Sequence, residues 1–229
     1  MINYNFFGKE CTIDSEYKDR TDLNQKLNDL NFKFGEVLLL NQIHGNDVVA
    51  VDDIKKVHGT QNLPKADGIV TNLKNIAIGI VTADCAPIIF YDEEKQIIGA
   101  CHAGWRGAKS GIIQETAKKM HELGAKNICA LIGPMIQQYS YQVSIDFYNE
   151  FLLETPNNLR FFKETADPIR WNFNLPNYIE SKLSQSGIND IENLMIDTYT
   201  NAQKYNSYRR FCHDSSENRG RNISVICID

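Results

Sequence analysis

The sequence contains no long apolar run and no concentration of positive charge. A membrane-spanning helix needs about 20 consecutive apolar residues, and no stretch of the chain approaches that length. The formal net charge is −5, and Lys and Arg form no long basic run, which argues against a nucleic-acid or membrane partner. The first residues contain neither a basic segment nor the apolar core of a secretory signal. We therefore expect a cytoplasmic protein.

The six cysteines form neither a Cys-x-x-Cys pair nor any regular spacing. Disulfide frameworks belong mainly to short secreted chains, so we expect reduced thiols here. A length of 229 residues, with 42% hydrophobic and 23% charged residues, is typical of a globular protein with a sizeable core. The chain shows no repeat, linker or low-complexity tract, which favours a single domain over residues 1–229.

Apolar β-branched runs alternate with stretches of helical periodicity, which favours an α/β domain with a mixed sheet. Strands are expected at residues 37–40, 48–51, 76–81, 88–91, 97–101, 128–132, 194–199 and 223–228. Helices are expected at residues 22–30, 111–123, 145–153 and 176–185. Apart from the first of these helices, residues 1–36 show little pattern. Pro87 has no backbone N–H, so the strand ladder should be interrupted beside Cys85.

Three reactive side chains, those of His44, Cys85 and His102, each follow or end an apolar run. Two imidazoles and one thiolate suit zinc, and three protein ligands leave the fourth position open, as in catalytic zinc sites. The same atoms also suit a metal-free site in which Cys85 is the nucleophile, His102 the base, and Asp84 or another polar group the orienting residue. Since these residues are distant in the sequence, spacing alone leaves both interpretations open. The remaining histidines, His58, His121 and His213, are interpreted as solvated.

Basic and aromatic residues occur together in two places. Gly104-Trp105-Arg106-Gly107 lies between an expected strand and an expected helix, where free N–H groups and a guanidinium suit an anion. Tyr208-Arg209-Arg210 is a second such cluster, which could bind a phosphate or an aromatic ring. On pattern alone, Arg106 can equally be a surface residue and Trp105 a core residue. The Tyr208 cluster is by itself a weak signal.

Five motifs occur in a fixed order and carry a resemblance to a known family. They are Gln42-Ile43-His44-Gly45, Ala66-Asp67-Gly68, Thr82-Ala83-Asp84-Cys85-Ala86-Pro87, His102-Ala103-Gly104-Trp105-Arg106-Gly107 and Ile132-Gly133-Pro134. From about residue 37 to the C-terminus the chain resembles the YfiH-like laccase-domain proteins, also named multicopper polyphenol oxidases and purine nucleoside phosphorylases. The resemblance implies a single α/β (α+β) domain with central mixed β-sheets flanked by helices, related to the catalytic domain of cytotoxic necrotizing factor toxins.

The resemblance also implies a chemistry. It identifies His44, Cys85 and His102 as the metal ligands, usually of zinc, with copper as the alternative metal. It implies phosphorolysis of adenosine, inosine, guanosine and methylthioadenosine, together with deamination of adenosine, so the expected partners are a purine nucleoside and phosphate. In that scheme Cys85 and His102 take part in catalysis, and Asp84 is the nearest candidate for a proton shuttle.

Motif position suggests the binding residues of the same scheme. Arg106 and Arg209 are expected to hold the phosphate, Tyr208 to form a wall for the purine, and Gln42 to contribute to the substrate site. Two departures from the family pattern concern the pocket. Residues 1–36 are short and lack the usual glycine-rich segment, and Asp197 stands where family members carry a cysteine.

Several functions remain open at the level of sequence. The first is the zinc-dependent phosphorylase and deaminase. The second is a metal-free Cys/His hydrolase or amidase acting on peptidoglycan precursors, and the third is a non-catalytic binding protein. A copper-dependent polyphenol oxidase fits less well, because a mononuclear copper plus a trinuclear cluster needs more ligands than five histidines supply. The sequence does not indicate an oligomeric state.

Overall fold

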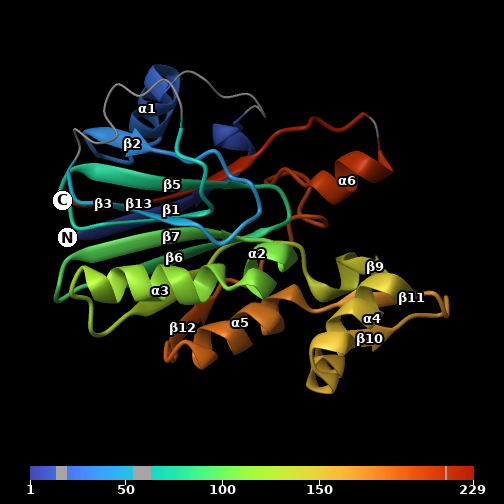
Figure 1. Cartoon of the computed structure of the whole chain (residues 1–229). Helices are drawn as coiled ribbons and strands as arrows, with labels where there is room; N and C mark the ends of the chain where they lie inside the picture. The colour runs from blue at the N-terminus through green and yellow to red at the C-terminus, as the bar shows by residue number, and fades with distance from the viewer. Residues whose placement is uncertain (14–19, 54–62, 215) are drawn as a thin grey trace.

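Two β-sheets lie against each other and carry helices on their outer faces (Figure 1). The computed structural model describes residues 1–13, 20–53, 63–214 and 216–229. The four-stranded sheet has the order β1 (Ile2–Phe7), β13 (Asn222–Ile228), β5 (Ile76–Thr82), β2 (Glu36–Leu38). The six-stranded sheet has the order β12 (Asp190–Asn193), β8 (Cys129–Ile132), β6 (Ala86–Asp92), β7 (Ile97–Ala103), β4 (Gly68–Thr71), β3 (Val48–Val51).

Both sheets are mixed, as the sequence predicts. In the smaller sheet β2 runs parallel to β5, while β13 is antiparallel to both β1 and β5. In the larger sheet the outer pairs β12/β8 and β3/β4 are parallel and the inner pairs are antiparallel. A third, antiparallel sheet consists of β10 (Phe162–Glu164), β11 (Arg170–Phe173) and β9 (Gln142–Ser144). The predicted α/β class with helix-flanked mixed sheets is therefore confirmed.

The core lies between the two large sheets and beneath each of them. Ile78 and Ile80 of β5 pack with Ile89 of β6 and Ile98 of β7, all fully buried. Such β-branched residues favour strands because they pack well on a pleated surface. A further core lies under the six-stranded sheet, and another packs α1 (Arg20–Asp29) on the four-stranded sheet. These cores hold the strand ends that carry the reactive side chains.

Four helices match predicted ones: α1, α3 (Ile112–Glu122), α4 (Ile145–Glu154) and α5 (Leu175–Gln185). The short helices α2 (Trp105–Ser110) and α6 (Tyr208–His213) were not predicted. Short 3₁₀ turns form at η1 (Lys9–Cys11), η3 (Gln138–Ser140) and η4 (Pro156–Phe161). Gly111 separates α2 from α3 with a left-handed φ of 97°, a conformation that glycine adopts without steric cost. Gly124 has φ 107° just after α3, as expected for a helix C-terminus.

The strand predicted at 194–199 is wrong. The strand of this region is β12, four residues earlier, and segment 194–199 contributes only an isolated bridge between Met135 and Asp197. Met195 has a positive φ of 53°, and Asp197 accepts hydrogen bonds from the backbone of Gln137 and Tyr199. A short polar side chain that bonds nearby backbone favours a turn over a ladder.

Two further differences concern the ends of strands. The sequence predicts no strand before residue 37, yet β1 forms there as an edge strand with only one of its residues, Phe7, buried. Residues Ile2 to Phe6 alternate between apolar and polar side chains, a strand signal that the prediction missed. The interruption expected at Pro87 occurs on one side only: pairing with β8 begins at Ile88, while pairing with β7 continues to Ala86.

Candidate metal and catalytic site

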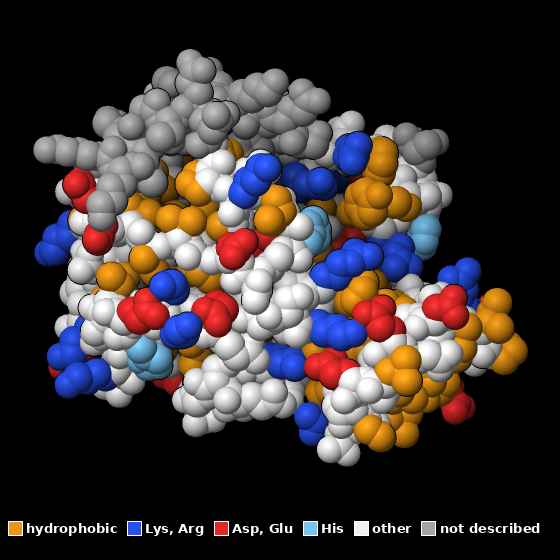
Figure 2. Space-filling view, viewed as in Figure 1, with side chains coloured by type: hydrophobic (Ala, Val, Ile, Leu, Met, Phe, Trp, Pro, Cys, Tyr) orange, Lys and Arg blue, Asp and Glu red, His pale blue; other side chains and the backbone are white. Residues whose placement is uncertain are grey.

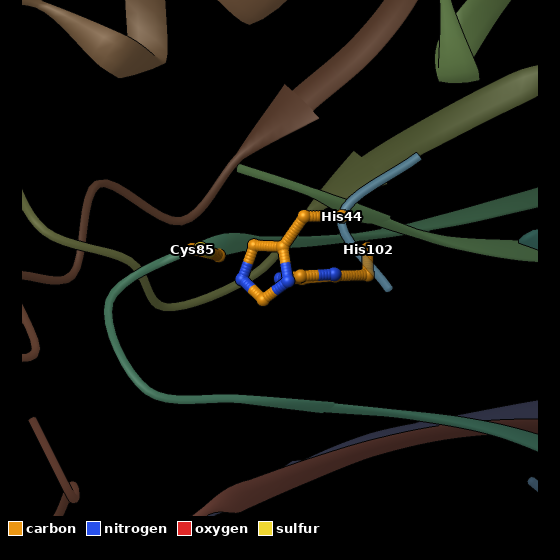
Figure 3. A group of neighbouring side chains, drawn as sticks. All are labelled: His44, Cys85 and His102. Atoms are coloured by element: carbon orange, nitrogen blue, oxygen red, sulfur yellow. The ribbon is translucent and has the colours of Figure 1, made fainter. Parts of the chain in front are cut away.

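His44, Cys85 and His102 meet at one point, although 41 residues separate the first from the second. Their ligand atoms all lie within 4.8 Å of one another. Figure 3 shows the two imidazoles beside Cys85. Their ring centroids are 4.6 Å apart and their planes meet at 84°. His102 is in β7, Cys85 directly precedes the neighbouring strand β6, and His44 lies in the loop after β2. His102 is buried, Cys85 is half-buried and His44 is exposed, so the group opens to solvent on the His44 side.

Asp67 organises this group and was given no role by the sequence. Its fully buried carboxylate lies 2.8 Å from Nδ1 of His102 and accepts hydrogen bonds from the backbone N–H groups of Ile43, His44 and Gly45 at 3.1, 3.0 and 2.8 Å. A carboxylate on Nδ1 fixes the tautomer and leaves Nε2 as the ligand atom. The same bonds hold His44 at its positive φ of 62°. The sequence did contain a signal for this residue: Asp67 directly precedes the buried strand β4, within the motif Ala66-Asp67-Gly68.

The charges of the group are coupled. Burial acts to raise the pKa of the Cys85 thiol, but the charge and hydrogen bonds of His102 and His44 outweigh it and lower that pKa from 9.0 to about 6. Burial acts to lower the pKa of His102, but the Cys85 thiolate and Asp67 raise it to about 9. The pKa of Asp67 is lowered, because the hydrogen bonds from His102 and the backbone outweigh its burial. A thiolate at neutral pH is the form that binds metal or acts as a nucleophile.

Gly104 keeps space beside the sulfur. A Cβ atom at this position would lie 2.8 Å from Sγ of Cys85 and 3.8 Å from Cδ2 of His44. Any side chain would therefore press on the ligand atoms from the loop before α2. The donor set of two imidazoles and one thiolate, the open side and this glycine together fit a zinc ion with one free coordination position.

Asp84 lies next to Cys85 in sequence but its carboxylate is engaged elsewhere. It accepts hydrogen bonds from Oγ1 of Thr198 at 2.6 Å, from Oγ of Ser207 at 3.0 Å and from the backbone N–H of Arg209 at 2.6 Å. Asp84 is buried and has a positive φ of 84°. These bonds join the segment that carries Cys85 to the first turn of α6, and thereby place Arg209.

Tyr141 is a second residue to which the sequence gave no role. The Arg209 guanidinium lies 5.5 Å from the centroid of its ring and donates a hydrogen bond to the backbone oxygen of Gln142 at 2.8 Å. Burial and the nearby charge of Cys85 raise the pKa of the Tyr141 hydroxyl, while the charges of Arg209 and Arg106 oppose that increase. The charges of Cys85, Arg106 and Arg209 therefore all influence the pKa of the Tyr141 hydroxyl. Figure 2 shows Lys and Arg side chains gathered beside histidine on this face.

The remaining predicted binding residues differ in how they are placed. Arg106 is exposed, and its guanidinium stacks 4.3 Å from the centroid of the Trp105 ring. Tyr208 is 48% exposed at the start of α6. The amide of Gln42 forms hydrogen bonds with both the N–H and the carbonyl of Val81, at 2.9 and 2.8 Å. Gln42 thus attaches the His44 loop to β5.

The other histidines and cysteines lie apart from this group. His121 and His213 are exposed, with Nδ1 atoms 2.8 Å from the oxygen of Ala125 and 3.0 Å from the hydroxyl of Tyr199, respectively. The position of His58 falls outside the described residues. All six cysteines are free thiols, as predicted. Within the described ranges, His44, Cys85 and His102 are the one group of this kind with metal-ligand spacing.

Comparisons with known proteins agree with the geometry. A family model described as multi-copper polyphenol oxidoreductase laccase matches residues 12–229. A purine nucleoside phosphorylase of Rickettsia prowazekii is 41% identical over 197 residues, which span 86% of this chain and 80% of that protein.

Two solved structures share the fold at low sequence identity. The hypothetical protein YfiH of Bacillus licheniformis superposes with a TM-score of 0.82 at 22% identity, covering 100% of this chain and 93% of the other. YlmD of Geobacillus stearothermophilus superposes with a TM-score of 0.80 at 22% identity, covering 99% and 91%. In the described part of the chain, none of the helices has the length and apolar character needed to cross a bilayer.

Proposed function

Since the chain belongs to the YfiH-like family of multi-copper polyphenol oxidoreductase laccases, we propose that it is a zinc-dependent purine nucleoside phosphorylase that also deaminates adenosine. The observation that carries the proposal is the convergence of His44, Cys85 and His102 within 4.8 Å, with one side open to solvent. The relative named purine nucleoside phosphorylase, 41% identical, supports the reaction class. The proposed substrates are adenosine, inosine, guanosine and methylthioadenosine, each with phosphate.

His44, Cys85 and His102 would hold the zinc ion, with Asp67 fixing the ring of His102 and the backbone of the loop that carries His44. Bound there, zinc supplies a Lewis acid and a water molecule that ionises near pH 7. Copper chemistry of the multicopper type needs a second, larger ligand cluster, whereas the described residues contain one group of three. The donor set therefore favours zinc.

Arg106 and Arg209 bind the phosphate in this scheme. A guanidinium presents paired N–H donors that match a phosphate edge. The charges of both arginines also influence the pKa of the Tyr141 hydroxyl, as the charge of Cys85 does. In phosphorolysis a phosphate oxygen forms a bond to C1′ of the ribose while the C1′–N9 bond breaks, and the purine leaves with a proton. Fixed positive charge holds the phosphate in position for that displacement.

Tyr141 and Asp84 have distinct tasks. Tyr141 keeps its proton at neutral pH, as tyrosine ordinarily does, and its raised pKa preserves that form beside the charged groups of the site. It serves as a donor at the wall of the site, which deamination of adenosine also requires. Asp84 acts mainly as a positioning residue, since Thr198, Ser207 and the N–H of Arg209 occupy its carboxylate. Tyr208, half exposed beside Arg209, forms the wall for the purine.

A nucleoside panel assayed with and without phosphate tests the proposal. We expect inosine to release hypoxanthine only when phosphate is present, and Arg209→Gln to raise the KM for phosphate about tenfold. Arg170→Gln, an exposed arginine of β11, is the matched control and should behave as wild type. Release of the base without phosphate, or no turnover of any purine nucleoside by zinc-loaded protein, would contradict the proposal.

A metal-free hydrolase is the second candidate, and one observation favours it. The Cys85 thiol has its pKa lowered to about 6 beside His102, which in turn bonds Asp67, and this is the arrangement of a thiol nucleophile with an oriented base. Such an enzyme would cleave an amide of a peptidoglycan precursor. Amide hydrolysis that survives exhaustive chelation would support it, while loss of all activity on chelation excludes it.

A further inference from the structure

A polar cavity lies away from the metal site, between the end of α4, the 3₁₀ turn η4 and α5. Its volume is about 340 Å³, at the lower end of the range for small-molecule sites. Figure 1 shows α4 and α5 on the same side of the large sheet. None of the residues assigned above to the metal or phosphate site lines this cavity.

Tyr178 of α5 lines the cavity and carries an unsatisfied hydroxyl. The side chain is 1% exposed, and its ring packs against Phe151 and Phe161 with centroids 5.3 and 5.2 Å away. Its hydroxyl has no hydrogen-bond partner among the residues that the structure describes. Leaving a buried hydroxyl unpaired is costly, so a group inside the cavity is expected to accept from it.

Two cations and a hydroxyl line the same cavity. Nζ of Lys182 lies 5.1 Å from the centroid of the Tyr178 ring and forms an ion pair with Oε1 of Glu154 at 3.8 Å. That distance is too long for a full hydrogen bond, so the N–H donors of Lys182 remain available to a ligand. Oγ of Ser181 accepts from Arg160 at 2.9 Å and from Gln185 at 3.3 Å. With both acceptor positions used, the Ser181 hydroxyl retains its proton for donation.

We propose that this cavity binds a phosphoryl group, carried by inorganic phosphate or by a sugar phosphate. Tyr178, Ser181, Lys182 and Arg160 offer donors from α5 and η4, whose number suits the three terminal oxygens of a phosphoryl group better than the two of a carboxylate. The two cations outweigh the one carboxylate, that of Glu154. The volume exceeds that of a single ion, and the acceptor oxygens of Glu154 and Asn158 suit sugar hydroxyls.

Calorimetric titration of the full chain with ribose 5-phosphate, and separately with inorganic phosphate, tests the site. Titrations are made in the Arg209→Gln background, in which phosphate binding at the proposed catalytic site is weakened about tenfold. We expect Lys182→Met to weaken binding at least tenfold and Tyr178→Phe severalfold. Lys163→Met is the control, because its ammonium lies over Tyr139 and does not line the cavity. Tighter binding of the sugar phosphate than of phosphate assigns the sugar to the cavity, and equal binding assigns the free ion.

A structural readout separates binding from folding. Removal of an unpartnered hydroxyl should leave the thermal midpoint of ligand-free Tyr178→Phe equal to, or above, that of wild type. The proposal falls if that midpoint drops, if Lys182→Met binds as wild type does, or if neither probe binds at millimolar concentration. If wild type binds phosphate and the single variant Arg209→Gln does not, the phosphate binds at the metal site and not in this cavity. That result overturns this proposal and leaves the proposed function intact.

Discussion

The carboxylate of Asp67 lies 2.8 Å from Nδ1 of His102 and also accepts the backbone N–H of His44 at 3.0 Å. One buried side chain therefore orients the ring of His102 and fixes the backbone of His44, 58 residues away in the sequence. Such partners of metal ligands set both ring orientation and ligand basicity.

Asp67→Asn should lower zinc affinity about 10- to 100-fold, because the amide cannot accept from all the groups that the carboxylate binds. Competition with a chelator measures the change. Asp47→Asn is the control, since Asp47 contributes its backbone carbonyl, which accepts from the N–H groups of Asp67 and Gly68. Equal zinc affinity in Asp67→Asn and wild type would show that the ligands hold their geometry without this carboxylate.

Gly104→Ala should displace the Cys85 sulfur, because the added Cβ would lie 2.8 Å from it. We expect at least a tenfold loss of zinc affinity. Gly45→Ala is a matched control in the facing loop, where the nearest atoms to a new Cβ are 3.7 Å away, an ordinary contact. The account predicts near wild-type affinity for that variant, and an equal effect of the two alanines would count against it.

Asp84→Asn should raise the KM for phosphate about tenfold while zinc content stays at the wild-type level. The physical reason is that the amide loses acceptor capacity toward Ser207 and the N–H of Arg209, so the first turn of α6 shifts. Asp214→Asn, at the other end of the same helix, is the control. Loss of zinc together with activity would instead assign Asp84 to the metal site itself.

Asp92→Asn should reduce the acid sensitivity of folding. Burial acts to raise the pKa of Asp92, but backbone N–H groups of Lys126, Lys95 and Asn127 outweigh it and hold the pKa below 3.8. A lowered pKa stabilises the fold above the unfolded-state value, and this contribution disappears as the pH falls below about 4.

At pH 7 the free energy of unfolding of Asp92→Asn should therefore be lower by about 1–3 kcal/mol, and the difference from wild type should shrink toward pH 3. Denaturant titrations at several pH values measure it. Glu93→Gln changes the exposed neighbouring carboxylate and should leave the curve unchanged. A difference that is constant with pH would indicate a loss of packing rather than of charge.

Most strands and helices that carry the core could be predicted, because their apolar residues form either a periodic stripe or a continuous run. The stripe of α3, from Ile112 to Met120, and the apolar run of β5 each identify one element without reference to the rest of the chain. β1 was missed although Ile2 to Phe6 alternate between apolar and polar side chains, because the run is short and the strand buries only Phe7. The turn at Asp197 depends on backbone groups that tertiary contacts bring within reach.

The site divides in the same manner. The ligands His44, Cys85 and His102 could be proposed from residue type and from a family resemblance, because reactive groups at strand ends have a recognisable pattern. Asp67 and Tyr141 could not be assigned, because their importance lies in contacts with residues distant in the sequence. Asp84 is the opposite case. Its position beside Cys85 suggests a chemical role, but its carboxylate accepts a hydrogen bond from the backbone N–H of Arg209 in α6.

Zinc K-edge X-ray absorption of the metal-loaded chain tests the central claim most directly. We predict one zinc per chain with two imidazole nitrogens, one sulfur at about 2.3 Å and one further oxygen ligand that is not from the protein. In Cys85→Ser the sulfur contribution should vanish, and in Cys212→Ser, which removes an exposed thiol, it should persist. A spectrum without sulfur, or with four protein ligands and no open position, would contradict the account.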